Sequence, residues 1–158
     1  MQGQEIRKRG RGIVMAVNAV VLALLIYESV VDIKKLRINI IPAAVVGVFG
    51  LLMNALVYKR PVWWLAGLAV GLVLLLAALV SRERIGYGDG IIFLVLGVCV
   101  EPESVLWILW LSMLAAGIVG CVGVIRGKRD RKSAMPYIPF VMAAYVAVFL
   151  LKMAGGLV

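Results

Sequence analysis

Histidine is absent from this sequence of 158 residues. Without an imidazole, Ser-His-Asp and Cys-His catalysis and every histidine-ligated metal site are excluded. Cysteine is scarce: Cys99 and Cys121 lie inside apolar runs and form no Cys-x-x-Cys pair, so we interpret both as packing residues. Any catalytic chemistry must come from carboxylates, hydroxyls or lysines, and neither a metal nor a cofactor is expected.

Acidic residues are also few, with 8 Asp and Glu against 17 Lys and Arg, which gives a net charge of +9. A basic chain can indicate nucleic-acid binding, but these cations fall between apolar runs, as the positive-inside rule for membrane proteins predicts. Apolar residues make up 64% of the chain and the mean hydropathy is +1.07. We therefore predict an all-α, polytopic integral membrane protein whose partner is the lipid bilayer and not nucleic acid.

Six apolar runs predict about six transmembrane helices in a single membrane-embedded domain, residues 1–158. A basic N-terminal tail, residues 1–12, precedes the first run, which is too long for a signal peptide and is expected to be retained. The fourth run, residues 90–100, is too short for a perpendicular span. Three explanations stay open: its helix begins earlier, near Gly86, or the bilayer is locally thinner, or the segment is re-entrant. The six runs are residues 13–31, 38–58, 61–80, 90–100, 105–125 and 136–151.

Two aspartates stand at the edges of these runs. Asp32 opens a polar segment after the first run, which we expect to be a loop, and Asp89 follows the third. Two spans separate them, so both lie on the same side of the membrane. That side carries ten Lys and Arg against seven on the other, which favours the cytoplasm.

Two carboxylates brought within a few ångströms repel each other when both are ionised, so such a pair holds one proton. That state suits an aspartic peptidase, in which one carboxylate activates water and the other donates a proton. Gly86 and Gly88, just before Asp89, would let an extended substrate backbone approach the carboxylate. Alone, Gly-x-Gly-Asp is a weak pattern, since an aspartate that caps a helix after a turn gives the same letters.

With both aspartates in place, the sequence resembles the type IV prepilin peptidases, membrane-embedded Gly-x-Gly-Asp aspartic peptidases. Their first aspartate opens a basic segment, here Asp32-Ile-Lys-Lys-Leu-Arg-Ile38, and their second lies in Gly86-Tyr-Gly-Asp89. Their last span commonly begins with a proline-rich segment similar to Met135-Pro-Tyr-Ile-Pro-Phe140. The chain departs from the family at Asn39-Ile40, where Pro-Asn is usual, and at Gly90-Ile91, where Val-Lys is frequent.

The resemblance implies an aspartic endopeptidase that removes the basic leader from type IV prepilins or pseudopilin-like precursors. Asp32 and Asp89 would be catalytic, at the cytoplasmic face of a bacterial or archaeal plasma membrane. The methyltransferase region of the larger members is absent, so no N-methylation is expected. The oligomeric state stays open, as does which aspartate is acid and which is base, although the nearby cations Lys34, Lys35 and Arg37 favour Asp32 as the base.

Glu28 lies one helical turn before Asp32, on the same face. It would influence the ionisation of Asp32 or recognise a basic leader, unless it simply extends toward the aqueous interface, as acids near span ends often do. Two other functions stay open at this point. One is a non-catalytic assembly protein of a pilus or secretion system, and the other is a small proton-coupled transporter.

Overall fold

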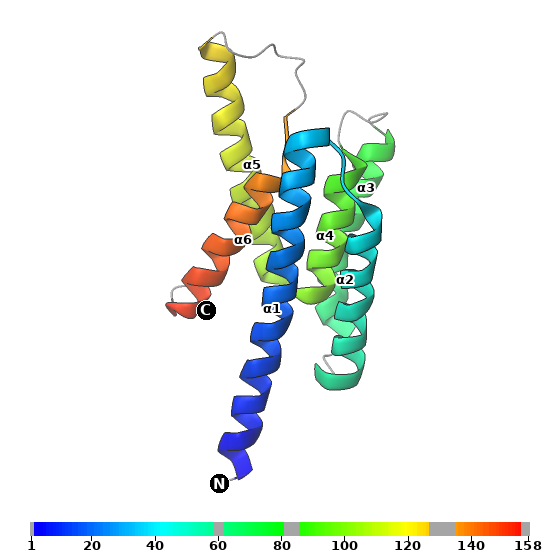
Figure 1. Cartoon of the computed structure of the whole chain (residues 1–158), viewed down its shortest axis with the longest axis vertical. Coiled ribbons are helices and arrows are strands. Elements are labelled where there is room, and N and C mark those ends of the chain that lie inside the picture. Colours follow the sequence, from blue (N-terminus) through cyan, green and yellow to red (C-terminus); the bar gives the residue numbers. More distant parts are fainter. Residues whose placement is uncertain (1, 59–61, 81–85, 127–134, 156–158) are drawn as a thin grey trace.

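The computed structural model describes residues 2–58, 62–80, 86–126 and 135–155. They form an all-α fold of six helices (Figure 1), as the apolar runs predict. A π-helical turn, Met53–Tyr58, extends α2, and a 3-10 turn, Val62–Ala66, precedes α3. The helices are α1 (Gln2–Lys35), α2 (Ile40–Leu52), α3 (Gly67–Val80), α4 (Tyr87–Cys99), α5 (Pro102–Ile125) and α6 (Ile138–Met153).

Helix α4 is the centre of the bundle. It packs mainly against α3 and α2, and α1 and α5 also contact it, while α6 packs against α5 and α1. Its side chains Ile92, Phe93 and Leu96 are fully buried. The helix begins at Tyr87, in agreement with the alternative that the fourth run starts near Gly86. Its 13 residues span about 20 Å. Its neighbours, rather than lipid, cover most of this short helix.

Glycines allow α3 and α4 to approach closely. A Cβ on Gly97 would lie 2.4 Å from the backbone of Gly67, and a Cβ on Gly71 would lie 2.5 Å from the backbone nitrogen of Leu94. Small residues at helix interfaces are the usual means of close packing within membranes, where no hydrophobic force drives helices together. This contact fixes the position of α4, and with it the position of Asp89 in its first turn.

Helix α1 is longer than predicted at both ends. Residues 2–12 of the expected tail are helical, and the segment from Asp32 to Lys35, which we expected to be a loop, is the last turn of the helix. Neither Gly nor Pro interrupts that segment, and Lys34 and Lys35 suit the negative end of the helix dipole. The helix ends where Leu36 takes the left-handed conformation, with φ of 50°.

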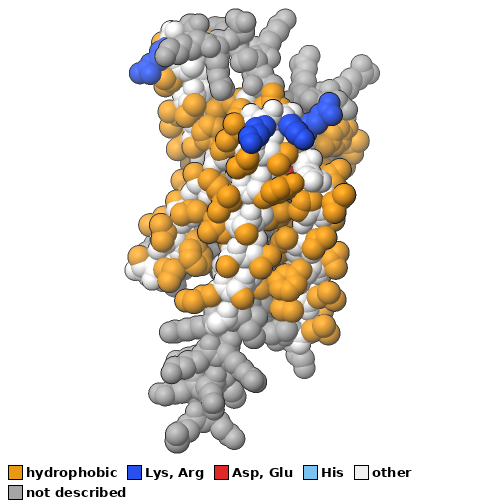
Figure 2. Space-filling model, in the orientation of Figure 1, with side chains coloured by type: hydrophobic (Ala, Val, Ile, Leu, Met, Phe, Trp, Pro, Cys, Tyr) orange, Lys and Arg blue, Asp and Glu red, His pale blue; other side chains and the backbone are white. Residues whose placement is uncertain are grey.

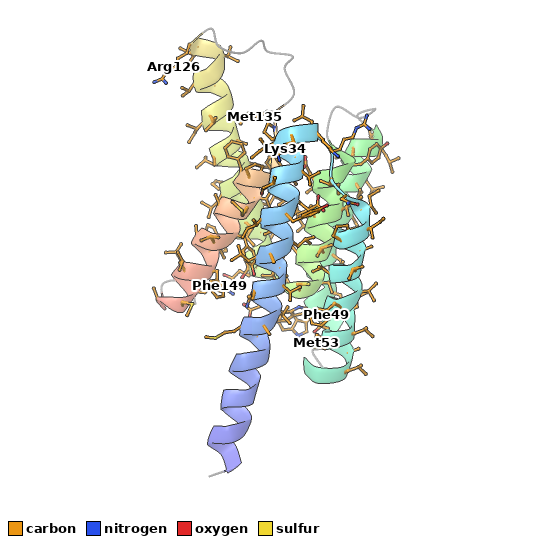
Figure 3. All side chains as sticks on the ribbon, viewed as in Figure 1. Lys34, Phe49, Met53, Arg126, Met135 and Phe149 are labelled. Atoms are coloured by element: carbon orange, nitrogen blue, oxygen red, sulfur yellow. The ribbon has the colours of Figure 1, made fainter. Side chains whose placement is uncertain are left out.

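Within the described part of the chain, three helices are long and apolar enough to cross a membrane: Val14–Lys35, Trp63–Val80 and Pro102–Ile125. The other three are shorter and also apolar. Hydrophobic side chains cover the face seen in Figure 2, and Lys and Arg gather at the upper end of that view. Figure 3 places Lys34, Met135 and Arg126 at this end, and Phe49, Met53 and Phe149 toward the other. The remaining predicted basic loops, residues 81–85 and 127–134, lie outside the described residues.

Candidate active site

A cleft of about 780 Å³ opens at the end of the bundle that carries Lys34 and Arg37. Both aspartates line it, so the prediction that Asp32 and Asp89 lie at the same end is confirmed. The cleft is polar near the aspartates and apolar where α3 and α5 contribute. Its lining comprises Asp32, Leu36, Arg37, Ile38, Leu74, Gly86, Tyr87, Gly88, Asp89, Leu109, Met113, Met135 and Tyr137.

Asp32 is held by the start of α6. Its side chain is buried, and Oδ2 accepts a hydrogen bond of 3.0 Å from the backbone N–H of Ile138. Ile138 is the first residue of α6, so its N–H has no partner within that helix and would otherwise be unsatisfied. Because this bond occupies Oδ2, it leaves Oδ1 to contact water or a substrate.

Asp89 lies in the first turn of α4, and its backbone N–H donates to the carbonyl of Gly86 at 3.1 Å. The two aspartates are close enough for their charges to interact. A Cβ on Gly86 would lie 3.3 Å from Oδ2 of Asp89, closer than nine in ten such contacts. Glycine at this position therefore gives the carboxylate room.

Gly88 has a packing role beyond the one its motif suggests. A Cβ on Gly88 would lie 2.9 Å from Cγ2 of Ile38, in the link between α1 and α2. The absence of a side chain thus lets the α1–α2 link close against α4 beside Asp89. That Gly86 and Gly88 also let a substrate backbone approach stays a prediction.

Glu28 lies in the interior and not at the aqueous interface, so the expectation that it simply extends toward water is wrong. It is completely buried, and Oε2 accepts a hydrogen bond of 2.9 Å from the backbone N–H of Asn39, the residue that caps α2. Oε1 makes no hydrogen bond with the described residues. Glu28 does not line the cleft, but its charge interacts with that of Asp32.

Tyr137 is a polar residue of the cleft that the sequence did not single out. Its hydroxyl lies 2.7 Å from Oγ of Ser112 on α5, and Ser112 donates to the carbonyl of Leu109 at 2.9 Å. Each hydroxyl has one hydrogen, so the phenol donates to Ser112 while Ser112 donates to Leu109, and Ser112 is the donor when its hydrogen turns toward Tyr137. The only signal in the sequence was the proline-rich segment around it, which predicts the start of a span but no contact with α5.

The electrostatic surroundings of Tyr137 keep it protonated. Tyr137 immediately precedes α6, and burial raises the pKa of its phenol. The nearby Asp89 carboxylate raises this pKa further, and the hydrogen bond with Ser112 lowers it. At neutral pH the phenol is therefore a hydrogen-bond donor close to Asp89.

A comparison with family models identifies the family of the chain. The chain matches the type IV leader peptidase family over residues 19–121, which is more than half of its length and includes both aspartates. No curated protein and no solved structure matches it. Among the described residues, no three His, Cys, Asp or Glu side chains gather where they could hold a metal ion. The chain, with its two aspartates in one cleft of an all-α bundle, belongs to the type IV leader peptidase family.

Proposed function

We propose that this peptidase is of the aspartic type and that Asp32 and Asp89 are its catalytic pair. The observation that carries the proposal is that the two carboxylates, from α1 and α4, line one cleft with their charges interacting. Its substrate would be a type IV prepilin or a pseudopilin-like precursor, as its family suggests. Cleavage would occur at the cytoplasmic face, because the cations Lys34, Lys35 and Arg37 stand at this end of the bundle.

The reaction needs one proton on the pair and one water molecule. The ionised aspartate takes a proton from water as the water oxygen attacks the scissile carbonyl carbon. The protonated aspartate gives its proton to the carbonyl oxygen, so a neutral tetrahedral diol forms. When the C–N bond breaks, a diol hydroxyl returns its proton to one aspartate and the other aspartate protonates the leaving amine. The pair again holds one proton, and no covalent intermediate forms.

The hydrogen bond between Asp32 and Ile138 supports Asp32 as the base in this scheme. It fixes one carboxylate oxygen of Asp32 and leaves the other to receive a proton. The protonated partner would then be Asp89.

Tyr137 has the geometry to help stabilise the oxygen that gains charge. It lines the same cleft as both aspartates, and its one hydrogen is free for a substrate when Ser112 donates to the phenol oxygen instead of to the Leu109 carbonyl. A carbonyl oxygen bound between Asp89 and Tyr137 would accept hydrogen bonds from both. Such donors stabilise a developing oxyanion because they are already oriented before the reaction.

The apolar part of the cleft suits the substrate class. Leu74, Leu109 and Met113 form this part between α3 and α5. The apolar helix of a precursor would lie against it, and the basic leader would lie toward the carboxylates of Asp32 and Asp89, away from the cation of Arg37. Family membership also argues against a proton-coupled transporter, and the two carboxylates lie at one end of the bundle instead of along a path through it.

The test is cleavage of a leader-bearing pilin by the purified protein in detergent or liposomes. Asp32→Asn and Asp89→Asn should each reduce cleavage below detection, and both keep the shape and hydrogen-bonding oxygen of the side chain. Glu103→Gln, an exposed carboxylate on the first turn of α5, is the matched control and should cleave as wild type does. Continued cleavage by either aspartate variant would refute the catalytic pair.

A further inference from the structure

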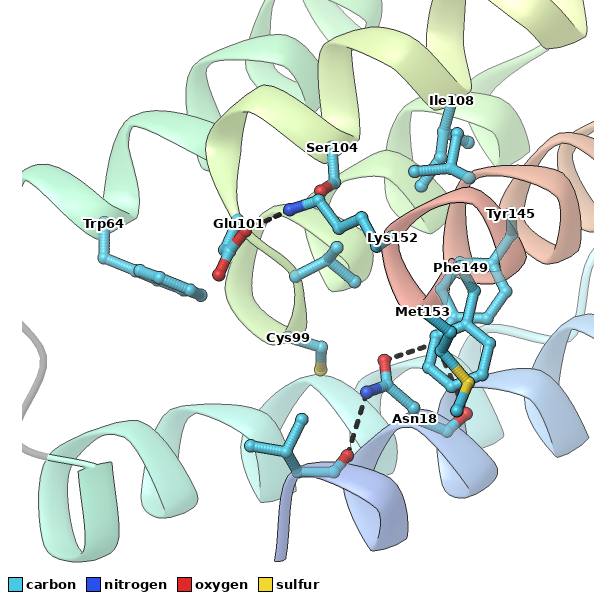
Figure 4. A pocket seen from close by; sticks show the side chains of 13 residues that line it. Asn18, Trp64, Cys99, Glu101, Ser104, Ile108, Tyr145, Phe149, Lys152 and Met153 are labelled. Carbon is cyan, nitrogen blue, oxygen red and sulfur yellow. Dashed lines mark hydrogen bonds and ion pairs between the residues drawn. The ribbon is translucent and has the colours of Figure 1, made fainter. Parts of the chain in front are cut away.

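A second cavity, of about 240 Å³, lies among α1, α4, α5, α6 and the 3-10 turn before α3 (Figure 4). It shares no lining residue with the candidate active site. The hydrogen bond from Tyr145 of α6 to Asn18 of α1 forms part of its wall. The proposed reaction uses none of these groups, so the cavity needs a separate explanation.

Charges of both signs stand in this cavity. Lys152 of α6 forms an ion pair with Glu101, the residue that precedes α5, and both side chains keep contact with solvent. Figure 4 shows the pair spanning the space between the ends of α5 and α6. An ammonium has three donors, and only one is needed for Glu101, so Lys152 can bind a second anionic group.

The first turn of α5 adds donors beside Lys152. Glu101 caps this helix without a hydrogen bond from its side chain, so the N–H groups at the positive end of the helix dipole lack a side-chain partner. Independently, the hydroxyl of Ser104 is buried and makes no hydrogen bond with the described residues. Ser104 lines the cavity and points toward the Glu101–Lys152 pair in Figure 4. A phosphate group would satisfy these donors together.

The rest of the cavity is apolar. Ile108, Val148 and Phe149 contribute to its lining, and the Trp64 ring lies beside Glu101 in Figure 4. A ligand here must therefore carry an anion, a cation near it and an apolar part. A phospholipid with a primary ammonium in its headgroup has all three. A free phosphate lacks the last two, and an anionic glycerol headgroup lacks the cation.

We propose that this cavity binds the headgroup of a zwitterionic aminophospholipid, such as phosphatidylethanolamine. Its phosphate contacts Lys152, Ser104 and the start of α5, and its ammonium contacts the Glu101 carboxylate. The lipid thereby adds two intermolecular ion pairs to the internal one and joins α5 to α6 at the end of the bundle remote from the aspartates.

The experiment uses the full chain in detergent, with phosphatidylethanolamine, phosphatidylglycerol, phosphatidylcholine or inorganic phosphate added. Binding is followed by native mass spectrometry and by the melting temperature. We expect phosphatidylethanolamine to bind roughly tenfold more tightly than the other three, because each charge-assisted hydrogen bond contributes more than 1 kcal/mol. Equal binding of all lipids would overturn the proposal in favour of a non-specific lipid shell. Preference for phosphatidylglycerol or for phosphate would overturn it in favour of a simple anion site.

Three variants assign the contacts. Ser104→Ala and Lys152→Met should each weaken phosphatidylethanolamine binding, whereas Glu101→Gln should remove the preference over phosphatidylglycerol. Lys34→Met, at the other end of the bundle, is the control cation and should change nothing. Ser104→Ala removes a hydroxyl that has no hydrogen-bond partner among the described residues, so this variant should fold as wild type does. It keeps the test valid if Lys152→Met fails to fold. Unchanged lipid selectivity in both Ser104→Ala and Glu101→Gln would sink the assignment.

Discussion

Asp32 on α1 accepts a hydrogen bond from the backbone N–H of Ile138 on α6, a residue 106 positions later in the chain. The bond satisfies one of the first-turn donors of α6 and fixes the orientation of a carboxylate in the cleft. The same aspartate thus has a structural contact and a proposed chemical role, and two substitutions can separate them.

Replacing Asp32 by Ala or by Asn should give equally inactive proteins of different stability. Asparagine keeps an oxygen that accepts from Ile138, whereas alanine leaves a buried N–H without a partner, which costs about 1–3 kcal/mol. The measurement is the melting temperature in detergent, together with cleavage of a leader-bearing pilin. Equal melting temperatures would show that the hydrogen bond contributes little to stability.

Tyr137→Phe should slow cleavage roughly 10- to 100-fold through kcat with little change in KM, because an oxyanion donor acts mainly in the transition state. Tyr27→Phe is the matched control, since its hydroxyl contacts Asn39 and Tyr27 does not line the cleft. The Tyr137 variant keeps the aromatic ring and should fold normally. A change in KM alone would indicate that Tyr137 only binds substrate.

Gly88→Ala should destabilise the protein by about 1–3 kcal/mol, because the added methyl group meets Ile38 in a closely packed region. The second substitution to combine with Gly88→Ala is Ile38→Ala, because Ile38→Val would keep both γ carbons that the added methyl group meets. The double variant should recover part of the lost stability, which a double-mutant cycle measures. Strictly additive losses would mean that Ile38 is not the residue in the way.

Glu28→Gln should retain stability and cleavage within about twofold, since glutamine can still accept from Asn39 and no longer buries a charge. Glu28→Ala should lose about 1–3 kcal/mol, because the part-buried N–H of Asn39 loses its acceptor. Chemical denaturation and pilin cleavage are the two readouts. Strong loss of cleavage in a stable Glu28→Gln protein would instead favour recognition of the leader by its charge.

Much of the fold follows from the sequence because each helix contains, or lies largely within, an apolar run bounded by charge, Pro or Gly. The position of Asp32 and Asp89 at the same end of the bundle followed from counting the spans between them. The last turn of α1 did not, since Asp32 to Lys35 look polar, and only the packed structure shows that the carboxylate turns inward. The interior position of Glu28 depends on the α1–α2 link folding back so that Asn39 reaches it.

Contacts between residues far apart in the chain could not be predicted from the sequence either. The bond between Tyr137 and Ser112 depends on how α5 meets the start of α6, and the pairing of Lys152 with Glu101 depends on where these helices end. The apolar pattern within one helix does not show which residues of another helix it will contact.

The contact between α1 and α6 has a consequence for biogenesis. Both proposed catalytic carboxylates are present once α4 has been synthesised, but the donor that orients Asp32 belongs to a helix made afterwards. A nascent chain arrested after α5 would carry the whole matched family region, residues 19–121, and still lack that donor. We therefore expect the orientation of Asp32, and with it full peptidase activity, to depend on insertion of the last helix.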